Sequence, residues 1–230
     1  MDFTGGADFS MQQLQSLSAA LTEGIHAKYG LQVQVEEPRH EKSNVSTWKV
    51  RITTRPAQQH MPAQRIHLDI CAVPSYDIRP MVLRNYYGVE MGTSGLILQV
   101  QSREEILADK IVALALRPNP MKNRDLWDIG WLIQQGITLP AELLPLKICD
   151  HHCEPERFTD LLNQRMDVLK NNPQTRQDFT KEMRRFLPTR VVKQTIAQED
   201  FWQYLVSTIT EQGFIALKAF ENTPGQSFSM

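Results

Sequence analysis

Residues 102–133 read SREEILADKIVALALRPNPMKNRDLWDIGWLI, and they predict two helices with a break between them. Ser102 and Glu105 have the Ser-x-x-Glu spacing of a capping box, in which two amide groups at a helix start are satisfied reciprocally. The first helix is therefore expected to begin near Arg103. Its apolar residues recur at helical spacing and predict one broad buried face: Ile106, Leu107, Ile111, Val112, Leu114 and Ala115.

Two prolines set the break between the predicted helices. Pro118 and Pro120 are expected to end the first helix, because proline has no N–H group and disfavours helical backbone in the residue before it. The second helix is expected to start at about Asn123. Its apolar residues are Leu126, Ile129, Trp131, Leu132 and Ile133.

The charged residues of the two predicted helices fall on defined faces. Lys110 and Arg117 lie on one face of the first helix, about two turns apart. Asp125 and Asp128 share a face of the second helix. A cationic face beside a pair of carboxylates could hold a phosphate and polarise a nucleophile. The same charges could instead pair across a helical hairpin for a few tenths of a kcal/mol each, and the spacing alone leaves both interpretations open.

The composition is that of a soluble globular protein. The chain has 230 residues, of which 41% are hydrophobic and 22% charged, and its formal net charge of -1 neither favours nor excludes a nucleic acid partner. No apolar run approaches the ~18 residues of a membrane span, and the start does not resemble a secretion signal. The few cysteines suggest a reducing compartment. We therefore expect a cytoplasmic protein with no membrane partner.

The rest of the chain predicts an α/β order. A short strand at the start is followed by an amphipathic helix over residues 9–29, which Gly30 ends. Strands are expected over residues 31–37, 45–54, 65–73 and 96–100. Residues 55–64 and 74–91 are expected to be irregular, and the later helices to cover residues 155–170, 173–186 and 197–220. This order predicts a mixed sheet with helices packed on it.

Asp69 stands out within the predicted strand RIHLDICAV, residues 65–73. A carboxylate on a mostly apolar strand is expensive to bury unless it is paired or bound to a cation. A metal site and an edge-strand aspartate that faces water both fit this pattern. His67 is expected on the same face as Asp69.

The region between Arg176 and Lys193 carries a local surplus of positive charge. Six basic residues stand there against two acidic ones. Lys181, Arg184 and Arg185 are therefore candidates for contact with RNA phosphates. A solvated helix face explains the same charges, and the sequence does not choose between the two.

The pattern EEILADKIVALALR, followed by RDLWDI, resembles the signature of the AbiEii/AbiGii toxin family. These are nucleotidyltransferase-like toxins of bacterial abortive-infection and toxin–antitoxin systems. The resemblance covers residues 1–135 and implies a nucleotidyltransferase-like domain there. It leaves residues 136–222 as a helical region and residues 223–230 as a tail that is expected to be disordered.

The resemblance also implies a metal-assisted site. Asp2 and Asp69 would hold Mg²⁺, which takes hard oxygen ligands and leaves positions for phosphates and water. Lys110 would bind the phosphates of an NTP, with Arg117 behind it.

Two further acids complete the implied site. Asp125 or Asp128 would orient Lys110 or activate the acceptor hydroxyl. The implied function is transfer of a nucleotide from an NTP to an RNA such as tRNA, or to a protein, beside a cognate antitoxin.

The start of the chain departs from the family pattern. Members read roughly D-h-D-F-T after a Gly-Ser or Gly-Gly segment that cradles phosphate, where h is hydrophobic. Here Met1 stands at the h position and Asp2 matches the second acid, while the first acid has no counterpart. We therefore expect the N-terminal edge to be truncated relative to the family. Two interpretations stay open: an active nucleotidyltransferase, and a degenerate member that binds nucleotide or RNA without catalysis.

Overall fold

A computed structural model describes residues 2–38, 44–55, 62–84, 92–93, 95–118 and 121–221. The chain divides into two compact units, Met1–Ser75 (unit 1) and Tyr76–Met230 (unit 2), and each is described by itself. Met1, Pro120 and the predicted tail from residue 223 lie outside the described residues. Within those residues, no helix combines the length and apolar character that crossing a membrane requires.

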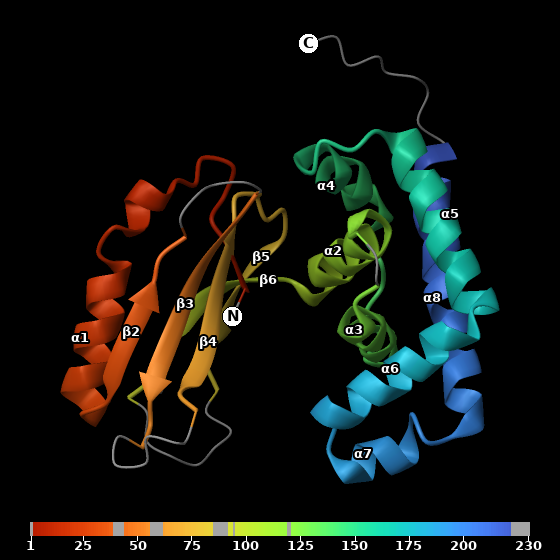
Figure 1. The fold of residues 1–230 in the computed structure, drawn as a ribbon. Coiled ribbons are helices and arrows are strands. Elements are labelled where there is room, and N and C mark those ends of the chain that lie inside the picture. Colours follow the sequence, from red (N-terminus) through yellow and green to blue (C-terminus); the bar gives the residue numbers. More distant parts are fainter. Residues whose placement is uncertain are drawn as a thin grey trace. The chain divides into compact units, whose positions relative to one another are not determined.

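Unit 1 is a four-stranded mixed sheet with one helix (Figure 1). Its strands are β1 (Asp2–Thr4), β2 (Gln32–Glu36), β3 (Val45–Thr53) and β4 (Gln64–Cys71). The strand order is β1-β4-β3-β2, with β1 parallel to β4 and the other pairs antiparallel. The helix α1 (Leu17–Tyr29) connects β1 to β2. The strand predicted over residues 96–100 does not join this mixed sheet, because it pairs with a separate strand instead.

Alternation along β3 and β4 gives the sheet one apolar face and one polar face. Trp48 and Val50 on β3 and Leu68 and Ile70 on β4 are buried, and apolar residues of α1 such as Leu21 pack against them. The residues between them, which include Asp69, therefore lie on the opposite face of the sheet. This division of faces agrees with the prediction.

The predicted helix over residues 9–29 is shorter in the structure. A 3₁₀ turn, η1 (Met11–Leu14), precedes α1, which begins only at Leu17. Ser10 and Gln13 form a capping box around the turn, so the polar start of the segment has its own local structure. Gly30 ends α1 in the left-handed conformation, at φ 64°, as expected.

Unit 2 begins with two antiparallel strands, β5 (Ile78–Val82) and β6 (Ile97–Gln101), which form a separate sheet. The prediction of irregular structure over residues 74–91 was wrong for β5. All five residues of β5 are exposed, so the strand shows none of the alternation by which a half-buried strand is recognised. Pro80 lies within it, which a two-stranded sheet tolerates because each strand is an edge.

The helices of unit 2 share one hydrophobic core. They are α2 (Arg103–Leu116), α3 (Asn123–Gln134), η2 (Ala141–Leu143), α4 (Leu144–Asp150), α5 (Pro155–Asn171), α6 (Pro173–Phe186), α7 (Thr189–Gln194) and α8 (Glu199–Glu221). Leu107 and Leu126, from the two helices of the opening stretch, are buried in one cluster with Phe158 and Ile209 from α5 and α8. Each such side chain contributes about 1.5–3 kcal/mol by burial. The predicted mixed α/β class is confirmed.

Candidate functional site

The charged faces of α2 and α3 meet in unit 2. Lys110 Nζ lies 2.7 Å from Asp125 Oδ1 and 2.7 Å from Asp128 Oδ2. Arg117 Nη1 lies 2.6 Å from Asp125 Oδ2. Two cations and two carboxylates predicted for the site are therefore in direct contact, and we call these four residues the charge cluster.

The two carboxylates of the charge cluster differ in exposure. The side chain of Asp125 is 5% exposed, and each of its oxygens accepts from a cation. The side chain of Asp128 is 43% exposed and pairs with Lys110. Asp125 is thus placed to fix Lys110 and Arg117, whereas Asp128 presents a carboxylate that solvent or a ligand can reach.

Lys110 keeps its positive charge in this setting. Burial lowers the pKa of its ammonium group, but the hydrogen bonds and charges of Asp125 and Asp128 outweigh burial, so the net shift of the pKa is upward. A lysine held as a cation can bind a phosphate but cannot act as a general base.

The start of α2 is anchored differently from the predicted capping box. The Ser102 hydroxyl accepts from the Glu105 amide at 3.0 Å, which is the expected half of the box. The Ser102 amide, however, donates to the Asp77 carbonyl at 2.8 Å. The Glu105 carboxylate accepts from the amides of Tyr76 and Asp77 at 2.9 and 2.7 Å. Glu105 therefore anchors the segment that precedes β5, which contains Tyr76 and Asp77, to α2.

A second group of charges surrounds Lys147, which the sequence analysis did not single out. Lys147 Nζ lies 2.8 Å from Glu105 Oε1 and 2.5 Å from Asp109 Oδ1, and its side chain is only 4% exposed. Burial raises the pKa of Asp109, against the opposing influence of Lys147 and of a hydrogen bond from Gln101. The lone cation in the apolar stretch LPLKIC was the signal available, because a lysine there must be paired to be buried.

The predicted metal carboxylates lie on neighbouring strands of unit 1. Asp2 on β1 is directly opposite Asp69 on β4 in a parallel pair, so both side chains lie on one face of the sheet. Asp69 Oδ1 also accepts from Thr47 Oγ1 at 2.6 Å. The structure therefore brings Asp2 and Asp69 together in unit 1 and, separately, the charge cluster in unit 2.

These two carboxylates fit a magnesium ion that is also held by a substrate. Mg²⁺ prefers oxygen ligands in an octahedron and is commonly bound through one or two carboxylates, with phosphates and water in the remaining positions. Among the described residues, no group of three or more histidine, cysteine or acidic side chains could hold a metal. The donors at Asp2 and Asp69 suit a metal that arrives with a nucleotide better than a permanently bound structural ion.

The polar face of the unit 1 sheet that carries Asp69 also carries four basic side chains. They are Lys49, Arg51, Arg65 and His67, and we call them the basic sheet face. Lys49 is directly opposite His67, and Arg51 is directly opposite Arg65. All four are exposed, and they line a shallow hollow of about 520 Å³ together with residues of β2. The sequence analysis placed Lys49 and Arg51 on this face but assigned them no role.

The RNA candidates of α6 also lie beside a hollow. Arg176, Lys181 and Arg184 line a cleft of about 730 Å³, with Thr180 and Gln177 between them. Arg185 is exposed but does not line the cleft. The structure thus gathers Lys181 and Arg184, and adds Arg176 from the same helix.

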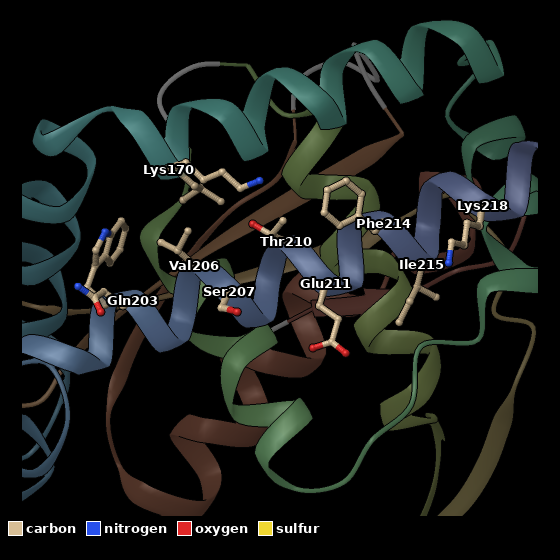
Figure 2. A pocket seen from close by; sticks show the side chains of 11 residues that line it. Lys170, Gln203, Val206, Ser207, Thr210, Glu211, Phe214, Ile215 and Lys218 are labelled. Atoms are coloured by element: carbon tan, nitrogen blue, oxygen red, sulfur yellow. The ribbon is translucent and has the colours of Figure 1, made fainter.

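The hollow along α8 is a different kind of surface (Figure 2). It has a volume of about 720 Å³, and residues of α8 such as Val206, Thr210 and Phe214 line it together with Lys170 of α5. Lys170 Nζ lies 5.4 Å from the centre of the Phe214 ring. The lining includes none of the predicted site residues, so this hollow is separate from the charge cluster.

The chain was compared with protein families, with curated proteins and with solved structures. No curated protein matches the chain. No solved structure matches it either. The sequence model of the family described as "Nucleotidyl transferase AbiEii toxin, Type IV TA system" matches residues 1–206, which is most of the chain. The chain therefore belongs to the AbiEii family of nucleotidyl transferase toxins from type IV toxin–antitoxin systems.

Proposed function

We propose that the chain transfers a nucleotide from an NTP to an RNA acceptor, tRNA or a tRNA-like RNA, in a magnesium-assisted reaction. The observation that carries the proposal is the charge cluster, in which a buried aspartate fixes two cations while a second carboxylate stays exposed. Family membership supports the reaction class. A protein acceptor would use the same chemistry.

The charge cluster supplies the phosphate-binding and proton-accepting groups of the proposal. Lys110 binds the phosphates of the NTP, and Arg117 is a second cation held by the same carboxylate. Asp125 orients both cations. The acceptor hydroxyl attacks the α-phosphorus, pyrophosphate leaves with the bridging oxygen, and Asp128 takes the hydroxyl proton.

In unit 1, the proposal assigns Asp2 and Asp69 to the metal. Mg²⁺, when bound, neutralises phosphate charge and supports departure of pyrophosphate. The Thr47 hydroxyl donates to Asp69 Oδ1 and would hold that carboxylate in place, so that its other oxygen would be available to the ion.

Partners follow from the same proposal. Lys181, Arg184 and Arg185 are proposed to contact RNA phosphates, and Lys181 and Arg184 do so from the cleft of α6. The toxin–antitoxin context supports a cognate antitoxin as a protein partner. The cytoplasm remains the expected compartment.

The second candidate is a member of the family that binds nucleotide or RNA without catalysis. The observation that favours it is the small set of possible metal ligands, since among the described residues Asp2 and Asp69 have no third metal-ligating side chain beside them. It predicts that NTP binds and that no nucleotide is transferred.

Thermal unfolding of the full chain with each NTP and magnesium tests the proposal. At ten times the dissociation constant, a bound NTP raises the free energy of unfolding by about 1.4 kcal/mol, which corresponds to roughly 3–6 °C in Tm. We expect the shift in the wild-type chain and its loss in Lys110→Ala and in Asp69→Asn. Arg157→Ala, which removes an exposed cation outside the cluster, is the control.

Transfer is then measured with α-labelled NTP and bulk bacterial tRNA. Label on the RNA that disappears in Asp128→Asn supports the proposed reaction. An NTP shift without label transfer favours the non-catalytic candidate. The absence of a shift with every NTP would contradict nucleotide binding in both candidates and leave RNA binding without catalysis as the form of the second candidate still to be measured.

A further inference from the structure

The basic sheet face contains an arrangement that works against the stability of unit 1. Arg51 on β3 is directly opposite Arg65 on β4. Side chains directly opposite in an antiparallel pair have Cβ atoms about 4.5–5.5 Å apart, and like charges in these positions repel each other. Strand pairing alone gives no reason for two arginines at this position.

Neighbouring acids do not relieve this repulsion. Glu36, which lies on the neighbouring strand β2, pairs with Lys49 instead of with an arginine, and its Oε1 atom lies 3.5 Å from Lys49 Nζ. Across the described residues, no carboxylate forms an ion pair with Arg51 or Arg65, and the residue opposite Arg51 on β2 is the uncharged Gln34. The two guanidinium groups therefore present unneutralised donors in a hollow, and guanidinium groups match phosphate oxygens in geometry.

The position of the two arginines indicates which phosphate-bearing molecule fits. Arg65 is four residues from Asp69 along β4, or roughly 13 Å at the rise of a strand. The phosphate oxygens that coordinate a metal at Asp69 lie within a few ångströms of that carboxylate, because Mg²⁺ binds oxygens at about 2.0–2.1 Å. A polynucleotide carries phosphates at regular intervals and can reach both places.

We propose that the basic sheet face binds the phosphate backbone of the acceptor RNA through Arg51 and Arg65, on the same sheet face as the Asp2–Asp69 carboxylates. The inference rests on the proposed transfer to RNA and names a surface that holds the acceptor. Lys49 and His67 lie between the arginine pair and the carboxylates, so the backbone would follow a row of donors along β3 and β4.

RNA binding by the full chain, measured without NTP, tests the proposal. The probe is bulk bacterial tRNA with a fluorescent 3′ label, and its anisotropy is followed at several salt concentrations. The variant Arg51→Gln/Arg65→Gln removes the arginine pair. The matched control, Lys28→Gln/Arg157→Gln, removes the same amount of charge from α1 and α5.

Counterion release gives the expected size of the effect. Each lost phosphate contact reduces the slope of log K against log salt by about 0.7 for a single strand, so the arginine variant should lose about 1.4 from the slope and bind about 25-fold more weakly at 0.1 M salt. The control should change binding less than threefold. Equal losses in the two variants, or unchanged binding in the arginine variant, would overturn the proposal.

A second variant separates binding from folding. Arg65→Glu replaces the repulsion with an attraction to Arg51, so its Tm should be equal to or higher than that of the wild type while RNA binding falls. A lower Tm would indicate that the arginines stabilise the sheet and would overturn the proposal. Displacement of the RNA by poly-glutamate at equal charge concentration would also overturn the proposal, because it would indicate that an acidic protein occupies this surface.

The outcomes distinguish this inference from the proposed function. Lys110→Ala should lose the NTP shift and keep RNA binding, whereas Arg51→Gln/Arg65→Gln should keep the NTP shift and lose RNA binding. RNA binding at the arginine pair without any NTP shift in the wild type would contradict nucleotidyl transfer and support the surface. An NTP shift without arginine-dependent RNA binding would contradict the RNA-binding surface and leave the proposed nucleotidyl transfer supported.

Discussion

At the scale of single residues, the two carboxylates of the charge cluster should contribute unequally to stability. Asp125→Asn leaves Lys110 and Arg117 without their shared, nearly buried partner, so we expect the free energy of unfolding to fall by about 1–3 kcal/mol. Asp128→Asn removes a more exposed ion pair and should cost less than about 1 kcal/mol. Urea unfolding of both variants measures the difference.

The double variant Asp125→Asn/Lys110→Met is the control for this pair. If Asp125 acts mainly by compensating Lys110, removing both charges should recover part of the loss, because only Arg117, the more exposed of the two cations, is then left without this partner. Equal losses in the two single variants would contradict the assignment of Asp125 as the positioning carboxylate and Asp128 as the accessible one.

Residue spacing predicted the members of the charge cluster but not their pairing. Helical geometry places Lys110 and Arg117 on one face of α2, and the structure shows that both contact Asp125. Whether such charges pair or bind a ligand depends on how two helices pack, which local spacing does not contain. Lys147 was missed for the same reason, because its partner Glu105 comes from a distant part of the sequence.

At the scale of elements, Tyr76 links the segment before β5 to α4. Its hydroxyl donates to Asp150 Oδ2 at 2.9 Å, and Lys147 Nζ lies 5.5 Å from the centre of its ring. Burial, followed by the hydrogen bond and negative charge of Asp150, raises the pKa of Tyr76 to about 12. The neutral phenol is therefore the form that the folded state favours.

This shift makes stability depend on pH in the alkaline range. An unfolded tyrosine loses its proton near its ordinary pKa of 10.0, whereas folded Tyr76 keeps it until about 12. Between these values the folded state binds more protons, so the free energy of unfolding should fall as pH rises. The fall should be shallower in Tyr76→Phe.

Phenolate absorbance after a rapid pH jump measures the same group directly. One of the five tyrosines of the native chain should ionise near pH 12, and this late step should be absent in Tyr76→Phe. Tyr204→Phe, which removes an exposed tyrosine of α8, should keep the step. A titration of Tyr76→Phe with the late step intact would contradict the contact with Asp150.

The regular elements were predicted well where an apolar pattern was present. The range of α6, residues 173–186, was predicted without error because Pro173 and Pro188 bracket it and Phe179 and Met183 supply its buried face. The strand β5 was missed because it buries nothing. Periodicity reports burial, so β5, which is held by pairing with β6, shows no such pattern in the sequence.

At the scale of the whole molecule, the hydrophobic cores indicate where the chain can be divided. One cluster of buried residues belongs to unit 1 and includes Trp48 and Leu68. The other joins α2 and α3 to α5 and α8. A division between residues 75 and 76 therefore leaves both cores intact, whereas the predicted domain boundary between residues 135 and 136 passes through the second core.

The fragment of residues 76–221 should consequently fold by itself. It keeps the whole second core, with fully buried residues such as Ile111, Leu126 and Phe158, so we expect cooperative unfolding by circular dichroism and a single step in urea. The fragment of residues 136–221 lacks α2 and α3, and its remaining helices would expose the residues that pack against them. At about 25 cal/mol per Å² of apolar surface, that loss exceeds the few kcal/mol by which a small domain is stable.

The two fragments together decide which boundary is physical. Cooperative unfolding of residues 76–221 and a broad, non-cooperative transition of residues 136–221 would place α2 and α3, and with them the charge cluster, in the helical unit. Cooperative unfolding of residues 136–221 alone would instead support a separate C-terminal domain as the sequence predicts. The first result would mean that Lys110 and Asp125 are held by the helical core, because the helices that carry them could then fold without the sheet that carries Asp2 and Asp69.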